Sequence, residues 1–184
     1  MKNWFILMFV LLGLFGTACE TVPAGNVGIK VYLLGGSKGV DHEELGVGRY
    51  WIGINEQLYI FPTFTQNYTW TKNSTEGSPN DESFNFQDIQ GLELNADIGI
   101  TYKINPKKVS LIFEKYKKGL DEITAIYLRN MVRDALVKRT SILDVEYIYG
   151  KGRAELIEQV TKDVKDLCEP IGIDIEKIYW IGRI

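Results

Sequence analysis

Residues 92–104, LELNADIGITYKI, decide the fold class of this 184-residue chain. Apolar residues alternate along this stretch with polar or small ones, which is the pattern of a β-strand with one buried face. The stretch therefore predicts a long strand that packs one side onto a core. The predicted core face carries Leu92, Leu94, Ala96, Ile98, Ile100, Tyr102 and Ile104.

The segments before this strand favour shorter strands, at residues 27–34, 64–71 and 84–89, because aromatic and β-branched residues are frequent there. Residues 49–54 and 57–61 have the same composition and flank Asn55-Glu56. Such a polar pair between two apolar runs is a turn signal, so we expect these two segments to form a hairpin.

After Pro106 the apolar residues recur at steps of three and four, which is typical of helices. The periodicity predicts helices over 109–116, 121–139 and 151–169, a further turn at 144–149, and a closing strand at 173–184. The order is strands, then helices, then one strand. It predicts an α+β fold in which helices pack on an antiparallel sheet.

The composition is that of a globular protein, with 45% hydrophobic and 24% charged residues and a formal net charge of -3. It excludes a disordered chain, a disulfide-rich scaffold and a multi-span membrane protein. Because no basic stripe is present, nucleic acid is not expected as a partner.

The N-terminus has the layout of a bacterial secretory signal. Lys2 is its only charge, an apolar run follows, and Gly16-Thr17-Ala18 precede Cys19. Leu14 to Cys19 resembles a lipobox, which predicts lipid attachment at Cys19. An uncleaved anchor helix and a plain signal peptide remain as alternatives. We expect a signal peptide or membrane anchor at 1–18, a tether at 19–26 and one domain at 27–184.

The sequence offers no set of catalytic or metal-binding residues. His42 is the only histidine and lies in a polar loop, where a solvated side chain is expected. Cys168 falls on the apolar stripe of a predicted helix, where we expect a small buried side chain. The acidic pairs lack the spacing of a calcium loop. We therefore predict no catalytic residue, no metal site and no cofactor.

Aromatic residues crowd the region after the first strand, and two interpretations stay open. They either form a packed core or lie in part at a membrane surface, where amphipathic rings favour the headgroup region. The residues concerned are Tyr50, Trp51, Tyr59, Phe61, Phe64, Tyr68 and Trp70.

Several segments also match, in order, the motifs of one known family. They are Val22-Pro23-Ala24-Gly25-Asn26-Val27-Gly28, then 46–51 followed by Tyr59-Ile60-Phe61-Pro62, then 86–104, then 127–140 with Arg129 and Arg133, and finally Ile171-Gly172-Ile173 to Trp180-Ile181. Together they resemble the SPFH domain of stomatin, prohibitin and flotillin, also called band 7. The resemblance covers roughly residues 22–184, and the lipobox resembles a bacterial lipoprotein subgroup.

The resemblance implies a non-enzymatic scaffold that is anchored in a membrane, self-associates, and organises integral membrane proteins or regulates a membrane protease. Its partners would be membrane lipids and membrane proteins, and a lipidated Cys19 would place it on the extracytoplasmic, periplasmic side. In the family the closing strand usually continues into a long charged helix, whereas this sequence stops at Ile184. It is either a minimal member or truncated. The alternative function is a monomeric lipoprotein module that binds a small ligand or an extracytoplasmic partner.

Overall fold

The computed structural model describes residues 19–35, 38–73, 75, 79–182 and 184. Its strands are β1 (Cys19–Val22), β2 (Asn26–Tyr32), β3 (Gly39–Val40), β4 (Gly48–Trp51), β5 (Glu56–Pro62), β6 (Gln66–Trp70), β7 (Phe84–Gln87), β8 (Glu93–Ile104) and β9 (Ile173–Ile181). Its helical segments are η1 (Pro106–Lys108), α2 (Val109–Tyr116), α3 (Leu120–Glu122), η2 (Ile123–Leu128), α4 (Arg129–Thr140), α5 (Val145–Tyr149), α6 (Arg153–Cys168) and η3 (Glu169–Ile171).

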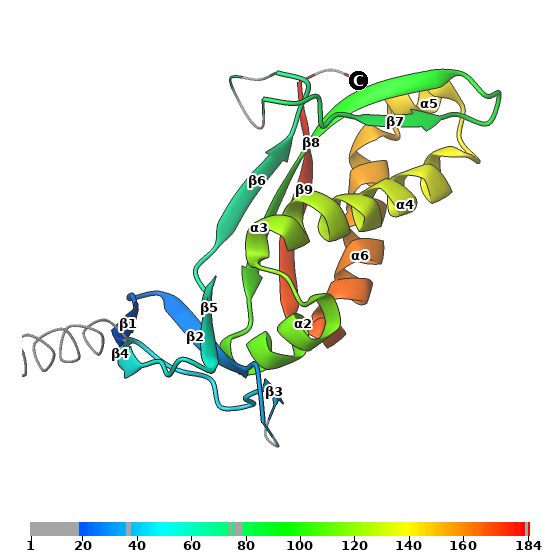
Figure 1. The fold of residues 1–184 in the computed structure, drawn as a ribbon. Helices are drawn as coiled ribbons and strands as arrows, with labels where there is room; N and C mark the ends of the chain where they lie inside the picture. Colours follow the sequence, from blue (N-terminus) through cyan, green and yellow to red (C-terminus); the bar gives the residue numbers. More distant parts are fainter. Residues whose placement is uncertain (1–18, 36–37, 74, 76–78, 183) are drawn as a thin grey trace, which may run out of the picture.

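The elements form two lobes, and the predicted α+β class is confirmed. The N-terminal lobe consists of β1 to β5 and carries no helix among its described residues. The C-terminal lobe consists of β6 to β9 and all the helical segments. The segment after β5 leads from one lobe into the other (Figure 1).

Strand β8 is the centre of the C-terminal lobe, because β6, β7 and β9 all pair with it in antiparallel register. Helices α4 and α6 lie together on one side of this sheet (Figure 1). Arg139 of α4 and Asp163 of α6 join these helices through two hydrogen bonds, from Nε at 2.8 Å and from Nη2 at 2.6 Å.

The predicted long strand is confirmed, and so is its buried face from Leu94 to Ile104. Leu92 is an exception, because it lies in the turn before β8 and is largely exposed. The opposite face is less open to water than the alternation predicts. The ring of Tyr179 on β9 covers Gly99, and a Cβ added at Gly99 would collide with it.

The predicted helix at 121–139 is also present, but it is not a regular α-helix throughout. The segment η2 is a π-helix between α3 and α4. Thr124, in this segment, donates a hydrogen bond from Oγ1 to the carbonyl of Leu120 at 3.0 Å. Short π segments are rare and occur most often at functional sites.

The hairpin predicted around Asn55-Glu56 is wrong. Strand β4 pairs with β1, and β5 pairs over its full length with β2. The connection at 52–55 therefore passes between two different sheets. Pairing with β2 aligns Ile29 and Phe61 on the core side, where both are fully buried, and this burial outweighs the local turn signal.

The segment expected as a tether, residues 19–26, is also more ordered than predicted. Cys19 to Val22 form β1, and Val22 is fully buried. The turn that follows needs glycine, because Gly25 has a φ of +78° and the ring of Phe64 lies 3.2 Å from the place of a Cβ. Residues 1–18, the predicted signal or anchor, lie outside the described residues.

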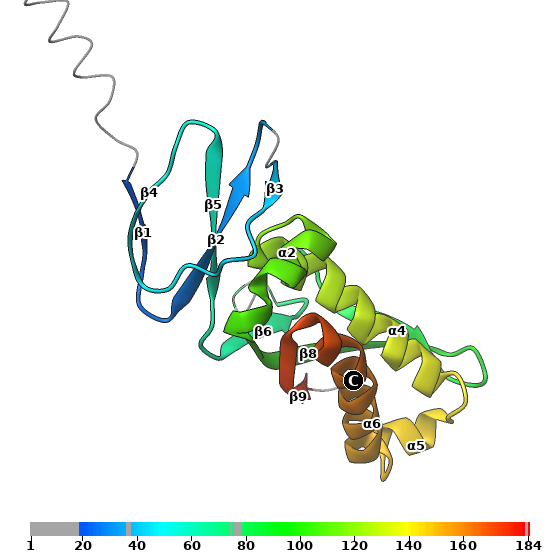
Figure 2. The ribbon, with the colours of Figure 1, turned by 90° about the horizontal axis from the view of Figure 1, so that it is seen from below.

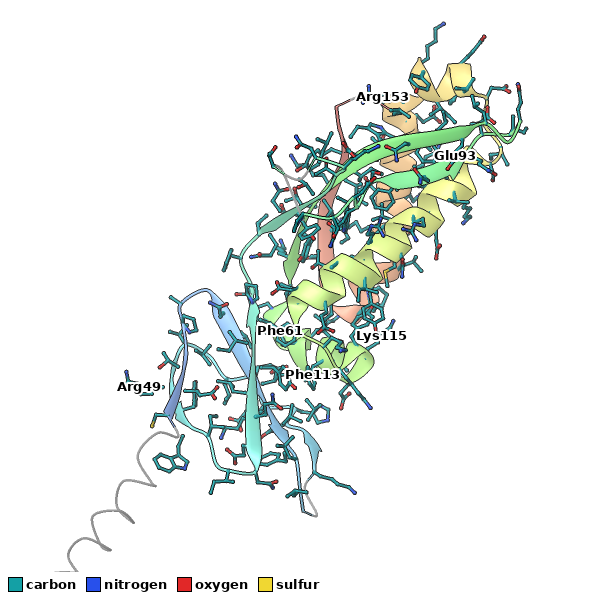
Figure 3. All side chains as sticks on the ribbon, turned by 45° about the horizontal axis from the view of Figure 1, so that its top comes forward. Arg49, Phe61, Glu93, Phe113, Lys115 and Arg153 are labelled. Atoms are coloured by element: carbon teal, nitrogen blue, oxygen red, sulfur yellow. The ribbon has the colours of Figure 1, made fainter. Side chains whose placement is uncertain are left out.

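The two lobes meet at helix α2. The ring of Tyr59 on β5 packs on Phe113 of α2 with a centroid distance of 4.3 Å. Figure 3 shows Phe61 and Phe113 at this junction. Glu44 accepts a hydrogen bond from Ser110, and His42 lies 3.5 Å from Glu114, so polar contacts border the aromatic one.

Candidate membrane-facing site

The predicted lipid-attachment residue, Cys19, is the first residue of β1. It is exposed and forms no disulfide. Its register partner across the sheet is Trp51, the last residue of β4. Paired residues in an antiparallel sheet have Cα atoms about 4.5–5.5 Å apart, so Cys19 and Trp51 are immediate neighbours.

The strand connections bring two loops to the same end of the lobe as Cys19. Strand β4 ends at Trp51, and only four residues, 52–55, separate it from the start of β5. Strand β2 ends there too, because Tyr32 pairs with Glu56. In Figure 2 the start of β1, the β4–β5 loop and the β2–β3 loop all lie along the top edge of the lobe.

Two hydrogen bonds hold these loops to each other. The amide of Leu33 donates to the carbonyl of Asn55 at 2.9 Å, and the side chain of Asn55 donates from Nδ2 to the carbonyl of Leu34 at 2.6 Å. Because these hydrogen bonds join the two loops, they limit the positions of the loop side chains. The side chains at this end of the lobe therefore form one ordered surface.

Large apolar side chains project from this surface into water. Leu33 is 53% exposed, Leu34 72% and Trp51 62%, while Ile54 is fully exposed. We call these four residues the apolar rim. Full burial of a side chain of this kind is worth about 1.5–3 kcal/mol, so a cluster of them favours contact with an apolar phase.

The sequence left open whether the aromatic residues of this region form a packed core or lie in part at a surface. The structure places some of them in each environment. Phe61 and Trp70 are fully buried, Tyr59 packs on Phe113, and Tyr68 packs on Trp70 at 5.5 Å. These four belong to the packed interior and its border. Trp51 alone of the aromatic cluster lies on the apolar rim. Phe64 is exposed as well, but at the Gly25 turn, which follows the far end of β1.

The remaining candidate residues of the sequence form no common site. His42 is largely exposed, and its Nε2 lies 3.5 Å from Glu114 Oε1. Cys168 is fully buried, and burial raises the pKa of its thiol to about 12, which keeps it protonated and unreactive. Among the residues that the structure describes, no group of three or more His, Cys, Asp and Glu side chains is placed to hold a metal ion.

Asp163 of α6 has a structural role. Its carboxylate accepts both hydrogen bonds from Arg139. These bonds hold the pKa of Asp163 below its usual value. The apolar rim itself was not predicted, because Leu33 and Leu34 were assigned to a strand at 27–34 and Ile54 to a strand at 49–54, whereas β2 ends at Tyr32 and β4 at Trp51.

A comparison with family models assigns the fold. The model of the SPFH domain / Band 7 family matches residues 20–184. The chain belongs to this family. SPFH proteins are in general membrane-associated scaffolds that self-associate and carry no enzymatic activity. No curated protein shows significant sequence similarity to the chain. In the part of the chain that the structure describes, no helix has the length and apolarity needed to cross a bilayer.

The opening SPFH motif at Val22 to Gly28 has a clear physical basis in this structure. Gly25 supplies the left-handed residue of the β1–β2 turn. Gly28 lies under the side chains of Val22 and Leu58, and a Cβ there would come within 2.8 and 2.9 Å of them. The two glycines therefore let β1 fold tightly back against β2.

Proposed function

We propose that this SPFH protein is a non-enzymatic scaffold, anchored by a lipid on Cys19, that organises membrane proteins or regulates a membrane protease. The supporting observation is that Cys19 and the apolar rim share one end of the N-terminal lobe. The proposal includes no catalytic residue and no cofactor. It places the domain on the extracytoplasmic side, as a periplasmic lipoprotein.

The position of Cys19 beside the apolar rim supports a joint contact of lipid and rim with the membrane. An acyl chain contributes about 0.8 kcal/mol for each buried methylene, and stable anchoring requires two signals. A lipid on Cys19 would bring its neighbour Trp51 to the headgroup region, which tryptophan favours. Ile54, Leu33 and Leu34 lie along the same edge, so they would be covered in the same step.

The C-terminal lobe extends away from this edge (Figure 2). In the proposed orientation it remains in the aqueous phase, where it is free to contact the soluble parts of membrane proteins and further copies of the chain. The alternative function is a monomeric binding module for a small ligand or an extracytoplasmic partner. Such a module would also be anchored by a lipid on Cys19, but it would not self-associate.

Metabolic labelling with an alkyne fatty acid tests the anchor. We expect label on the wild type and none on Cys19→Ala, together with an intact mass that lacks residues 1–18. An unlabelled protein with an intact N-terminus would contradict lipidation and indicate an anchor helix. An unlabelled protein cleaved after the signal would contradict any anchor at this site.

Fluorescence quenching tests the orientation at the bilayer. We expect brominated phospholipids to quench the wild type more than Trp51→Phe, because Trp70 is fully buried and Trp180, on β9, belongs to the C-terminal lobe. The matched control is Phe64→Trp in the Trp51→Phe background, which restores an exposed indole at the Gly25 turn instead. Equal quenching of Trp51→Phe and the wild type would contradict the orientation.

The size of the native assembly distinguishes scaffold from monomeric module. We expect large particles in mild detergent and co-purification of integral membrane proteins after cross-linking in cells. A species of one chain with no membrane protein attached would favour the monomeric module, whatever the labelling result.

A further inference from the structure

A cavity of about 300 Å³ lies where the two lobes join, and it is separate from the membrane-facing end. Its walls come from the end of β5, from β6, from Tyr102 of β8 and from residues 119–124. Figure 1 shows α3 close to the lower end of β6. The volume is at the lower end for ligand pockets, so it suits one small chemical group.

The hydrogen bonds at the inner wall fix the direction of one tyrosine hydroxyl. Thr124 Oγ1 donates to the carbonyl of Leu120 at 3.0 Å. The hydroxyl of Tyr102 lies 2.5 Å from the same Oγ1, and a hydroxyl has only one proton to give. Tyr102 must therefore be the donor to Thr124. Its oxygen presents only lone pairs to any further partner.

The hydroxyl of Tyr68, on the lining, has also used its only donor, because it donates to Glu82 Oε2 at 3.0 Å. The two amides of the lining are mixed groups. Gln66 donates one N–H of Nε2 to the carbonyl of Phe64 at 3.3 Å and keeps a second N–H and Oε1. The oxygen of Asn67 accepts from Thr101 and Tyr179, which leaves its Nδ2 group as a donor. The two tyrosine oxygens are therefore the acceptors of the cavity.

The charge of the site is negative and comes from one residue. Asp121 is the only charged residue of the described lining, and its side chain is exposed at the mouth of the cavity. Burial first, then the hydrogen bond to Glu82 and the charges of Glu82 and Asp121, raise the pKa of Tyr68 to about 12. None of the described lining residues is Lys, Arg or His. The nearby Lys118 is already paired with Glu122 at 2.8 Å.

The π-helix adds an independent observation. Segment η2 begins at Ile123, and Thr124 within it both lines the cavity and accepts from Tyr102. A π segment widens the helix locally at a cost in stability, and such segments are found most often beside binding and catalytic sites. Here the irregular turn coincides with the inner wall of the cavity.

We propose that this cavity binds an alkylammonium or alkylguanidinium group. The cationic head would lie among Asp121 and the oxygens of Tyr68 and Tyr102, and its stem would lie along Ile60 and Pro62. A charged donor suits this site because charge-assisted hydrogen bonds are about twice as strong as neutral ones. A free amine and a lysine side chain of a partner protein share this chemistry.

Ligand-observed NMR on the full chain in detergent micelles tests the site at pH 7. The probes are n-butylammonium, its neutral counterpart n-butanol, and the peptide acetyl-Gly-Lys-Gly-amide. We expect n-butylammonium to bind with a millimolar dissociation constant that rises at least fivefold in Asp121→Asn. Asp134→Asn, which removes an exposed carboxylate of α4 outside the lining, is the matched control and should leave the constant unchanged.

The two cationic probes distinguish the source of the ligand. Binding of n-butylammonium alone supports a site for a free amine, and binding of the peptide as well supports a lysine from a partner. Equal binding of n-butanol, or no difference between the wild type and Asp121→Asn, would overturn the proposal. If Asp121→Asn fails to fold by circular dichroism, Tyr68→Phe replaces it, with an expected loss of two- to threefold.

Discussion

The two lobes bury their apolar side chains to very different extents. In the described part of the N-terminal lobe, only Val22, Ile29, Ile52 and Phe61 are buried apolar residues. The C-terminal lobe contains the rest of the core, which runs from Trp70 to Ile178 across sheet and helices. A small sheet with so few buried side chains is marginal on its own. The N-terminal lobe therefore depends on its strand pairing and on its contact with α2.

The largest expected effect comes from the C-terminal core. Ile100→Ala removes a fully buried side chain from β8, and we expect a loss of about 2–5 kcal/mol in the free energy of unfolding. The matched control in the other lobe is Ile54→Ala, which removes a fully exposed side chain and should leave the stability almost unchanged. Urea unfolding followed by circular dichroism measures both. Similar losses for the two variants would contradict the unequal division of the core.

The next effect should stay within the N-terminal lobe. Gly28→Val places a side chain against Val22 and Leu58, and overpacking of this kind costs about 1–3 kcal/mol. Hydrogen exchange should show faster exchange in β2 and β5 and little change in β8. Gly46→Val is the control, because a Cβ at Gly46 meets nothing within 4 Å. Faster exchange throughout β8 would mean that the lobes unfold as one unit.

A smaller effect, dependent on pH, is expected at the contact between α4 and α6. The folded-state pKa of Asp163 is lowered by Arg139, so its contribution to stability is present above the unfolded pKa of about 3.9 and is lost as the pH falls through the folded pKa. Asp163→Asn should lower the urea midpoint at pH 7, and its difference from the wild type should shrink toward pH 3. A difference independent of pH would contradict the role of the ion pair.

The smallest effect is expected where the lobes touch at the surface. His42 and Glu114 are both exposed, and substitutions at such pairs usually change stability by less than about 0.5 kcal/mol. His42→Gln should leave the thermal midpoint unchanged, whereas Tyr59→Ala at the same junction should lower it. A clear loss in His42→Gln would show that this polar contact, rather than the aromatic one, joins the lobes.

The sequence predicted the C-terminal lobe better than the N-terminal one for a physical reason. Strand β8 and helix α6 each bury one face, so period two and period 3.6 are plain in their residues. Strands β1 and β4 are only four residues long and lie far apart in the sequence. A local sequence pattern cannot predict that they pair with each other. The Asn55-Glu56 signal correctly marked a turn but could not say which strands it connects.

The candidate sites show the same limit. Cys19 could be proposed from the sequence because a lipobox is a local motif, and the structure shows only that this residue is exposed. The cavity between the lobes was not predicted, because Tyr68, Tyr102 and Asp121 come from three separate segments. The pairing of β6 with β8 and the position of α3 bring them together, and the spacing of these residues in the sequence predicts neither.

Strand β1 has a mechanical consequence. A flexible tether at residues 19–26 would let the domain swivel freely about its point of attachment, but here the chain enters a paired strand at Cys19. A pull on Cys19 along the strand loads the four residue pairs between β1 and β4 in shear, so that they resist together and do not open one after another. A force applied at that residue would pass directly into the sheet, so a lipid bound there would tilt together with the sheet and not independently of it.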